Sequence, residues 1–131
     1  GGEHSAHYYF RDFWRADTGM LAAMHVLAAL GEQGRPLSAL AAGYSRYAAS
    51  GEINSTVDDA AARTADVRKA FEDADGVRVD ELDGLTVELP DGAWFNLRAS
   101  NTEPLLRLNV EAPDTARLTE LTERVLGMVR A

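Results

Sequence analysis

Residues 85–110 read LTVELPDGAWFNLRASNTEPLLRLNV, and their pattern decides the fold class of this chain. Apolar side chains recur at every second position in three segments of the stretch, which is the period of a β-strand with one buried face. Residues 90–92, Pro-Asp-Gly, separate the first two segments and are typical of a hairpin turn. The polar residues 98–104 separate the second segment from the third. The stretch therefore predicts antiparallel strands joined by short connections.

Elements on both sides of this stretch complete the prediction of an α+β domain. A short strand over 52–57 and a helix over about 59–74 come before it. We read 77–89 as one strand, and Asp114 as the cap of a terminal helix. The order predicts a four-stranded, mainly antiparallel sheet with two helices on one face, which is the β-α-β-β-β-α, TBP-like arrangement.

The beginning of the chain has a helical pattern instead. Asp17 is expected to be the N-cap of a helix over about 18–30, which Gly31 would end. A second helix is expected to begin near Pro36, so that the two form a helical hairpin. Small residues at 48–51 then predict a linker.

This linker divides the chain into residues 1–50 and 51–131, of which the second is a complete domain in our interpretation. Residues 7–10, His-Tyr-Tyr-Phe, predict a short strand. We expect the pairing partners of this strand to lie outside the chain. Because the sequence starts with glycine and enters a patterned segment at once, we also expect the chain to be part of a longer protein.

Composition limits the classes of function. The chain has 131 residues, of which 46% are apolar and 26% charged, and it carries a formal net charge of −8 with a pI near 4.8. This charge argues against nucleic-acid or anionic-membrane partners, so an anion would have to be bound by a local basic site. There are no cysteines and no apolar run long enough for a membrane span, and we expect a cytoplasmic protein.

The polar loop at 98–104 has the chemistry of a phosphate site. Arg98 offers a planar, fixed cation, Ser100 and Thr102 offer hydroxyl groups, and Asn101 offers an amide. A guanidinium can bind two phosphate oxygens while short hydroxyls and turn amides reach a third. The alternative is an ordinary turn, because serine, asparagine, threonine and proline are also common turn residues.

A second polar segment lies at residues 2–7. Glu3 and Ser5, two positions apart, can face a polyol together, and His7 could contact a phosphate or transfer a proton. Two alternatives remain: a metal site formed by Glu3, His4 and His7, or a catalytic triad around Ser5. Neither has the spacing or sequence context that its chemistry usually shows.

Both polar segments resemble motifs of the α-D-phosphohexomutase family. Residues 2–12, GEHSAHYYFRD, are similar to its sugar-binding loop, and residues 98–104, RASNTEP, are similar to its C-terminal phosphate-binding loop. The two occur in the family's order, with the helical hairpin and the α+β domain between them. The resemblance covers essentially the whole chain.

The resemblance implies a four-domain enzyme, most similar to bacterial phosphomannomutases and phosphoglucomutases. A phosphoserine in the first domain would phosphorylate a hexose phosphate, giving a hexose bisphosphate intermediate that also acts as activator. Mg²⁺ would be held by the second domain. On this resemblance the present chain is the end of the third, sugar-binding domain and all of the fourth, and alone it is expected to be inactive, without its missing N-terminal domains.

The resemblance also implies roles for individual residues. Glu3 and Ser5 would bind sugar hydroxyls, and His7 would lie near the reacting end as an auxiliary group. The phosphate that is not transferred would be bound by four residues: Arg98, Ser100, Asn101 and Thr102. Ala6 departs from the family, in which glycine is common at this position, and therefore restricts the loop.

Two questions of function stay open at this point. Residues 51–131 could instead form a noncatalytic anion-binding or interaction module. Within the family, mannose, glucose and glucosamine phosphates are all candidate substrates. His4, at a variable position of the sugar loop, favours mannose by likeness only.

Overall fold

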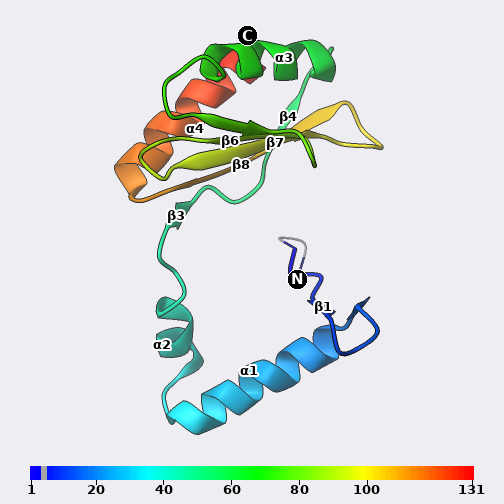
Figure 1. Cartoon of the computed structure of the whole chain (residues 1–131), viewed down its shortest axis with the longest axis vertical. Coiled ribbons are helices and arrows are strands. Elements are labelled where there is room, and N and C mark those ends of the chain that lie inside the picture. Colours follow the sequence, from blue (N-terminus) through cyan, green and yellow to red (C-terminus); the bar gives the residue numbers. More distant parts are fainter. Residues whose placement is uncertain (4–5) are drawn as a thin grey trace. The chain divides into compact units, whose positions relative to one another are not determined.

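The computed structural model describes residues 1–3 and 6–131. These residues divide into two compact units, Gly1–Ser45 and Arg46–Ala131, each with its own internal contacts. The first unit is blue to cyan in Figure 1, and the second runs from cyan-green to red. The predicted domain boundary, between residues 50 and 51, stays a prediction.

The first unit begins with a small antiparallel pair of strands. β1 (Tyr9–Phe10) pairs with β2 (Ala16–Asp17), in the register Tyr9↔Asp17 and Phe10↔Ala16. The expectation that this strand would find no partner within the chain was wrong. Residues 11–15 form a local turn, in which Trp14 and Arg15 have positive φ angles, and this turn brings the chain back beside β1.

Helices α1 (Gly19–Gln33) and α2 (Leu37–Ala42) follow. The cap of α1 is Thr18, whose hydroxyl accepts a hydrogen bond from the Leu21 amide at 3.3 Å, and not Asp17 as predicted. The helix also continues past Gly31. It ends at Gly34, which has a φ of 59° and therefore takes the left-handed conformation that terminates helices.

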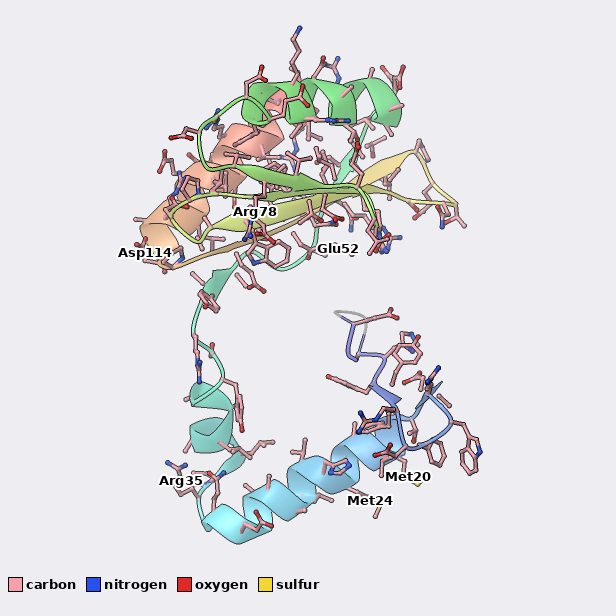
Figure 2. All side chains as sticks on the ribbon, in the orientation of Figure 1. Met20, Met24, Arg35, Glu52, Arg78 and Asp114 are labelled. Atoms are coloured by element: carbon pink, nitrogen blue, oxygen red, sulfur yellow. The ribbon has the colours of Figure 1, made fainter. Side chains whose placement is uncertain are left out.

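The helices of this unit have little core between them. α1 has no buried residue, and Met20 and Met24, one turn apart, are 77% and 60% exposed (Figure 2). In α2 only Leu40 is buried. Tyr44 and Tyr47 follow the end of α2 and are exposed. The buried hydrophobic cluster of the described residues lies in the second unit.

The second unit is an antiparallel sheet with two helices. Its strands are β3 (Ala48–Ala49), β4 (Ile53–Thr56), β5 (Arg78–Asp80), β6 (Leu85–Glu88), β7 (Trp94–Ala99) and β8 (Leu105–Ala112). Their order is β3-β8-β7-β6-β5, with β4 also paired to β8, and every pair is antiparallel. The helices are α3 (Ala60–Phe71) and α4 (Thr115–Val129). The predicted α+β class, with a mainly antiparallel sheet, is confirmed.

The number of strands differs from the four predicted. The run over 77–89 is two strands, β5 and β6, because the chain reverses between them at Gly84, where φ is 74°. The Asp80 carboxylate supports this turn by accepting a hydrogen bond from the Leu82 amide at 2.8 Å. The predicted linker also contains a short strand, β3, whose residues pair with Glu111 and Ala112.

One face of the sheet forms the core, and both helices lie on that face (Figure 1). Alternate residues of the strands point into it, and Phe95 is fully buried against Phe71 of α3, with ring centroids 5.1 Å apart. From α4, Leu121, Val125 and Val129 complete the core. The other face of the sheet carries the polar half of each alternation, including Arg98 and Arg107, which therefore lie outside the core.

Candidate functional site

The loop between β7 and β8 lies beside a pocket of about 450 Å³. All four residues predicted to bind phosphate line this pocket. Its lining consists of Asp83, Gly84, Arg98, Ala99, Ser100, Asn101, Thr102 and Arg107. The structure therefore brings the predicted phosphate residues together, and it adds residues that sequence reasoning missed.

Backbone hydrogen bonds hold the loop in a compact turn. The Ser100 amide donates to the Leu105 carbonyl at 2.8 Å, which closes the loop at its base. The Thr102 amide lies 3.5 Å from the Ser100 hydroxyl, and the carbonyl of Pro104 accepts from the Val57 amide at 3.2 Å. Ser100 is half-buried and Asn101 and Thr102 are exposed, so their polar groups are accessible to a ligand.

Arg107 is a second cation at the site. It pairs across the sheet with Arg98, so both side chains lie on the same, helix-free face. Its Nε atom is buried and has no hydrogen-bond partner among the residues that the structure describes. Its Nη1 lies 3.9 Å from Glu52 Oε2. Two arginines in directly opposite positions repel each other, and an anion between them would relieve that repulsion.

Asp83 supplies a negative charge to this pair. Its Oδ2 lies 3.1 Å from Arg98 Nη1, and both side chains are substantially exposed. The turn that carries Asp83 is fixed by Asn96, whose amide donates to the Asp83 carbonyl at 2.8 Å and to the Thr86 hydroxyl at 3.0 Å. The Asp83 carboxylate therefore competes with a phosphate oxygen for the Arg98 guanidinium.

Gly84 brings the same turn close to Arg98. A Cβ atom at this position would lie 2.7 Å from the Leu97 carbonyl oxygen and 3.0 Å from Arg98 Cα. Only glycine permits this approach together with the positive φ. The Asp-Gly turn was visible in the sequence, but its contact with the loop depends on the pairing of β6 with β7, which our single-strand interpretation of 77–89 did not contain.

Replacing Asp83 by asparagine is expected to raise the affinity for inorganic phosphate by about two- to fivefold at low salt, because exposed ion pairs are worth up to about 1 kcal/mol. The variant removes the carboxylate that competes for Arg98 and leaves the turn backbone intact. Phosphate binding to the chain can be measured by calorimetry. Glu81→Gln is the matched control, since Glu81 lies in the same turn but pairs with Arg68 at 3.0 Å. Weaker binding by D83N than by E81Q would show that Asp83 assists the arginine instead.

The predicted sugar segment lies in the first unit. The Glu3 amide donates to the His7 carbonyl at 2.9 Å, and the Ala6 amide donates to the Glu3 carbonyl at 3.1 Å, so these three residues lie close together. Ala6 has a φ of 64°, a conformation that glycine takes more easily, which fits the departure noted in the sequence. A hydrogen bond with the Glu3 carboxylate, together with its negative charge, raises the pKa of Tyr9. Ser5 lies outside the described residues.

His7 is paired with Asp17, a contact that was not predicted from the sequence. The distance from His7 Nδ1 to Asp17 Oδ2 is 2.7 Å, and the Tyr8 amide donates to the other carboxylate oxygen at 2.8 Å. The hydrogen bond and the charge of Asp17 raise the pKa of His7. The hydrogen bonds from His7 and Tyr8 lower the pKa of Asp17. Residue type marks Asp17 as a candidate helix cap, but no pattern in the sequence reveals its contact with His7.

The described residues do not fit a Mg²⁺ site. Within residues 1–3 and 6–131, no three histidine, cysteine, aspartate or glutamate side chains gather in a set that could hold a metal ion. The alternatives that involve His4 and Ser5 concern residues outside this range. None of the helices in the same range is long and apolar enough to cross a membrane.

Two family models match successive parts of the chain. Residues 52–128 match the family model of the phosphoglucomutase/phosphomannomutase C-terminal domain. The chain belongs to the phosphoglucomutase/phosphomannomutase family. Residues 1–47 match the model of the family's α/β/α domain III. The predicted membership of the phosphohexomutases is thereby confirmed.

Individual relatives support the same assignment. The chain is 43% identical to a phosphomannomutase of Escherichia coli over 99% of its own length, and 38% identical to a phosphomannomutase of Methanocaldococcus jannaschii over 98%. A crystal structure of a family protein from Burkholderia thailandensis aligns with 98% of the chain, with a TM-score of 0.73 and 30% identity. The chain spans about 28% of the length of each of these relatives.

Proposed function

We propose that this chain is the sugar-binding and phosphate-binding part of a phosphohexomutase. The reaction would be the interconversion of hexose 6-phosphate and hexose 1-phosphate through a hexose bisphosphate. The proposal is supported by the family membership and by relatives named phosphomannomutase. Because the chain spans about 28% of those relatives, the activity is proposed for a protein that also carries the remaining domains.

The observation that carries the proposal is the convergence of Arg98, Ser100, Asn101 and Thr102 on one pocket, with Arg107 opposite Arg98. In a chain with a net charge of −8, a local pair of arginines is the feature that can attract a dianion. Hydroxyls and turn amides beside the arginines supply further donors for phosphate oxygens. The same pocket supports a role in holding the phosphate that is not transferred.

In this function the residues of the chain would act by positioning. Phosphoryl transfer depends mostly on orientation and charge neutralisation, and holding the far phosphate fixes the sugar relative to the reacting group. Glu3 would accept hydrogen bonds from the sugar hydroxyls, Ser5 would donate or accept them, and His7 would lie near the reacting hydroxyl. These roles rest on the resemblance of the sugar segment.

The phosphoserine and the Mg²⁺ of the family would belong to domains outside this chain, where the metal would neutralise phosphate charge. The chain alone is therefore expected to be inactive. Exposed Met20, Met24 and Leu27 on α1 support packing against the remaining part of domain III, because a helix with no buried residue gains stability chiefly from such a partner. We further propose a cytoplasmic location and a mannose or glucose phosphate as substrate.

Titration of the chain with inorganic phosphate, followed through its backbone amides, tests the phosphate site directly. We expect the amide signals of Ser100, Asn101 and Thr102 to shift, while those of α3 and α4 stay unchanged. Sodium chloride at equal ionic strength is the control, since general screening affects all exposed charges. Unchanged loop signals at millimolar phosphate would remove the support for the pocket as a phosphate site.

The activity is tested with the longer protein that contains the remaining domains. We expect it to convert mannose 6-phosphate or glucose 6-phosphate to the 1-phosphate, and comparison with glucosamine 6-phosphate would identify the preferred sugar. Phosphate binding by the loop without any mutase activity would favour the alternative, a noncatalytic anion-binding module.

A further inference from the structure

Asp17 makes two contacts with the segment that carries His7. Its Oδ1 accepts a hydrogen bond from the Tyr8 amide at 2.8 Å, and its Oδ2 lies 2.7 Å from His7 Nδ1. The neighbouring Thr18 caps α1, so the Asp17 carboxylate is not used by the helix. Both of its oxygens are instead directed at residues 7 and 8.

The backbone keeps these partners in register. Tyr9 pairs with Asp17 in the β1–β2 ladder, and the Thr18 amide donates to the Tyr8 carbonyl at 3.0 Å. On its other side, the carbonyl of His7 accepts from the Glu3 amide at 2.9 Å. The contact between His7 and Asp17 is thus supported from both directions and does not depend on two free side chains meeting by chance.

The contact defines the state of the imidazole ring. An ionised carboxylate can only accept hydrogen bonds, so the nitrogen that faces Asp17 must carry the proton. In the neutral ring the opposite nitrogen, Nε2, is then the acceptor. About half of the His7 side chain is exposed, 52%, so a ligand can reach this ring.

The charged groups that act on the ring are carboxylates. The hydrogen bond and charge of Asp17 raise the pKa of His7, and the charge of Glu3 adds to this effect. Removing the charge of Asp17 should therefore lower the pKa of His7. The pKa of Asp17 is itself lowered by the hydrogen bond from His7, so the carboxylate stays ionised beside the ring.

From this geometry we infer that Asp17 is a positioning residue, which holds the His7 ring so that Nε2 can take a proton from a sugar hydroxyl. The inference rests on the proposed function, since it names the group that would activate the attacking hydroxyl. The proton leaves the hydroxyl oxygen and forms an N–H bond at Nε2, which converts the imidazole to an imidazolium. Asp17 stabilises the positive charge that this transfer creates.

The state of the ring is tested on the chain itself, by nitrogen and proton NMR of its imidazoles as a function of pH. In the unaltered chain we expect His7 to carry its proton on Nδ1 when neutral and to titrate above the ordinary pKa of histidine. Asp17→Asn should lower that pKa and mix the tautomers, while it keeps an acceptor for the Tyr8 amide. Asp12→Asn is the matched control, because Asp12 lies in the turn that leads into β2 but contacts Arg11 at 3.3 Å. Equal pKa values and tautomers of His7 in D17N and D12N would overturn the inference.

The catalytic consequence is tested in the longer protein. D17N is expected to lower kcat by about tenfold with little change in KM, since general-base catalysis contributes roughly 10²- to 10⁴-fold and only the positioning is impaired. The acidic limb of the pH profile should also move to lower pH. A D17N profile identical to that of D12N would overturn the role of Asp17, whereas inactivity of the unaltered protein would defeat the proposed function and leave the NMR result to decide the ring state.

Discussion

Replacing Arg98 by alanine is expected to raise the KM for hexose phosphate about 10- to 100-fold in the longer protein, because a hydrogen bond to a charged group is worth about 1.5–3 kcal/mol. Arg98 is the residue of the loop that can bind two phosphate oxygens at once. In the unaltered chain the Asp83 carboxylate lies 3.1 Å from the Arg98 guanidinium, so the loss of Arg98 also leaves an unpaired negative charge at the pocket. Steady-state kinetics and phosphate titration of the chain measure the effect.

Arg78→Ala is the control for this experiment. Arg78 lies on β5, on the same sheet, and its side chain pairs with Glu88 away from the loop (Figure 2). The control removes an equal charge from an exposed arginine, so it reports the effect of net charge alone. If R98A and R78A had the same KM, the loop would not be the phosphate site.

Replacing Phe95 by alanine is expected to reduce the free energy of unfolding of the second unit by about 3–5 kcal/mol. Phe95 is fully buried, packs edge-on against Phe71, and lies between Val87 and Val110 on the neighbouring strands. The substitution leaves a cavity at the centre of the core, and the surrounding strands are too tightly paired to close it. Denaturation with urea, followed by circular dichroism, measures the loss.

The matched control for this variant is Leu82→Ala. Leu82 is a large apolar residue of the same unit, but it lies on the β5–β6 turn and is 93% exposed. Its replacement should change the free energy of unfolding by no more than about 0.5 kcal/mol. A loss below about 1 kcal/mol for F95A would contradict the central place of Phe95 in the core, given the usual cost of such a truncation.

Strands and helices of the second unit were predictable because their buried positions follow the period of each element. The alternation around Phe95 and the helical spacing of Leu121 and Val125 appear directly in the structure. The division of 77–89 was missed because alternation continues on both sides of Gly84, and periodicity alone does not distinguish one strand from a hairpin. In the first unit, Gly31 misled the prediction, since it lies within α1, whereas Gly34 adopts the positive φ that ends this helix.

The candidate site was predictable to the extent that its residues are adjacent in the sequence. Arg98, Ser100, Asn101 and Thr102 form one loop, and the structure gathers them beside one pocket, although their role in binding is still a prediction. Asp83 and Arg107 reach the same pocket through strand pairing. Arg107 left only a weak signal, because polar residues alternate with buried ones along the whole of β8, as on any strand with one solvent face. Asp17 left none, since its sequence position suits a helix cap equally well.

The alternation of β7 has a consequence for how this family can change. Phe95 and Leu97 point into the core, and Arg98, next in sequence, points to the opposite face at the pocket. Inserting or deleting one residue in this strand would turn the apolar side chains toward water and the arginine toward the core in a single event. Point substitutions can therefore vary ligand preference and packing separately. A change of length by one residue in this strand would affect both together, so we expect such changes in the turns and not in the strand.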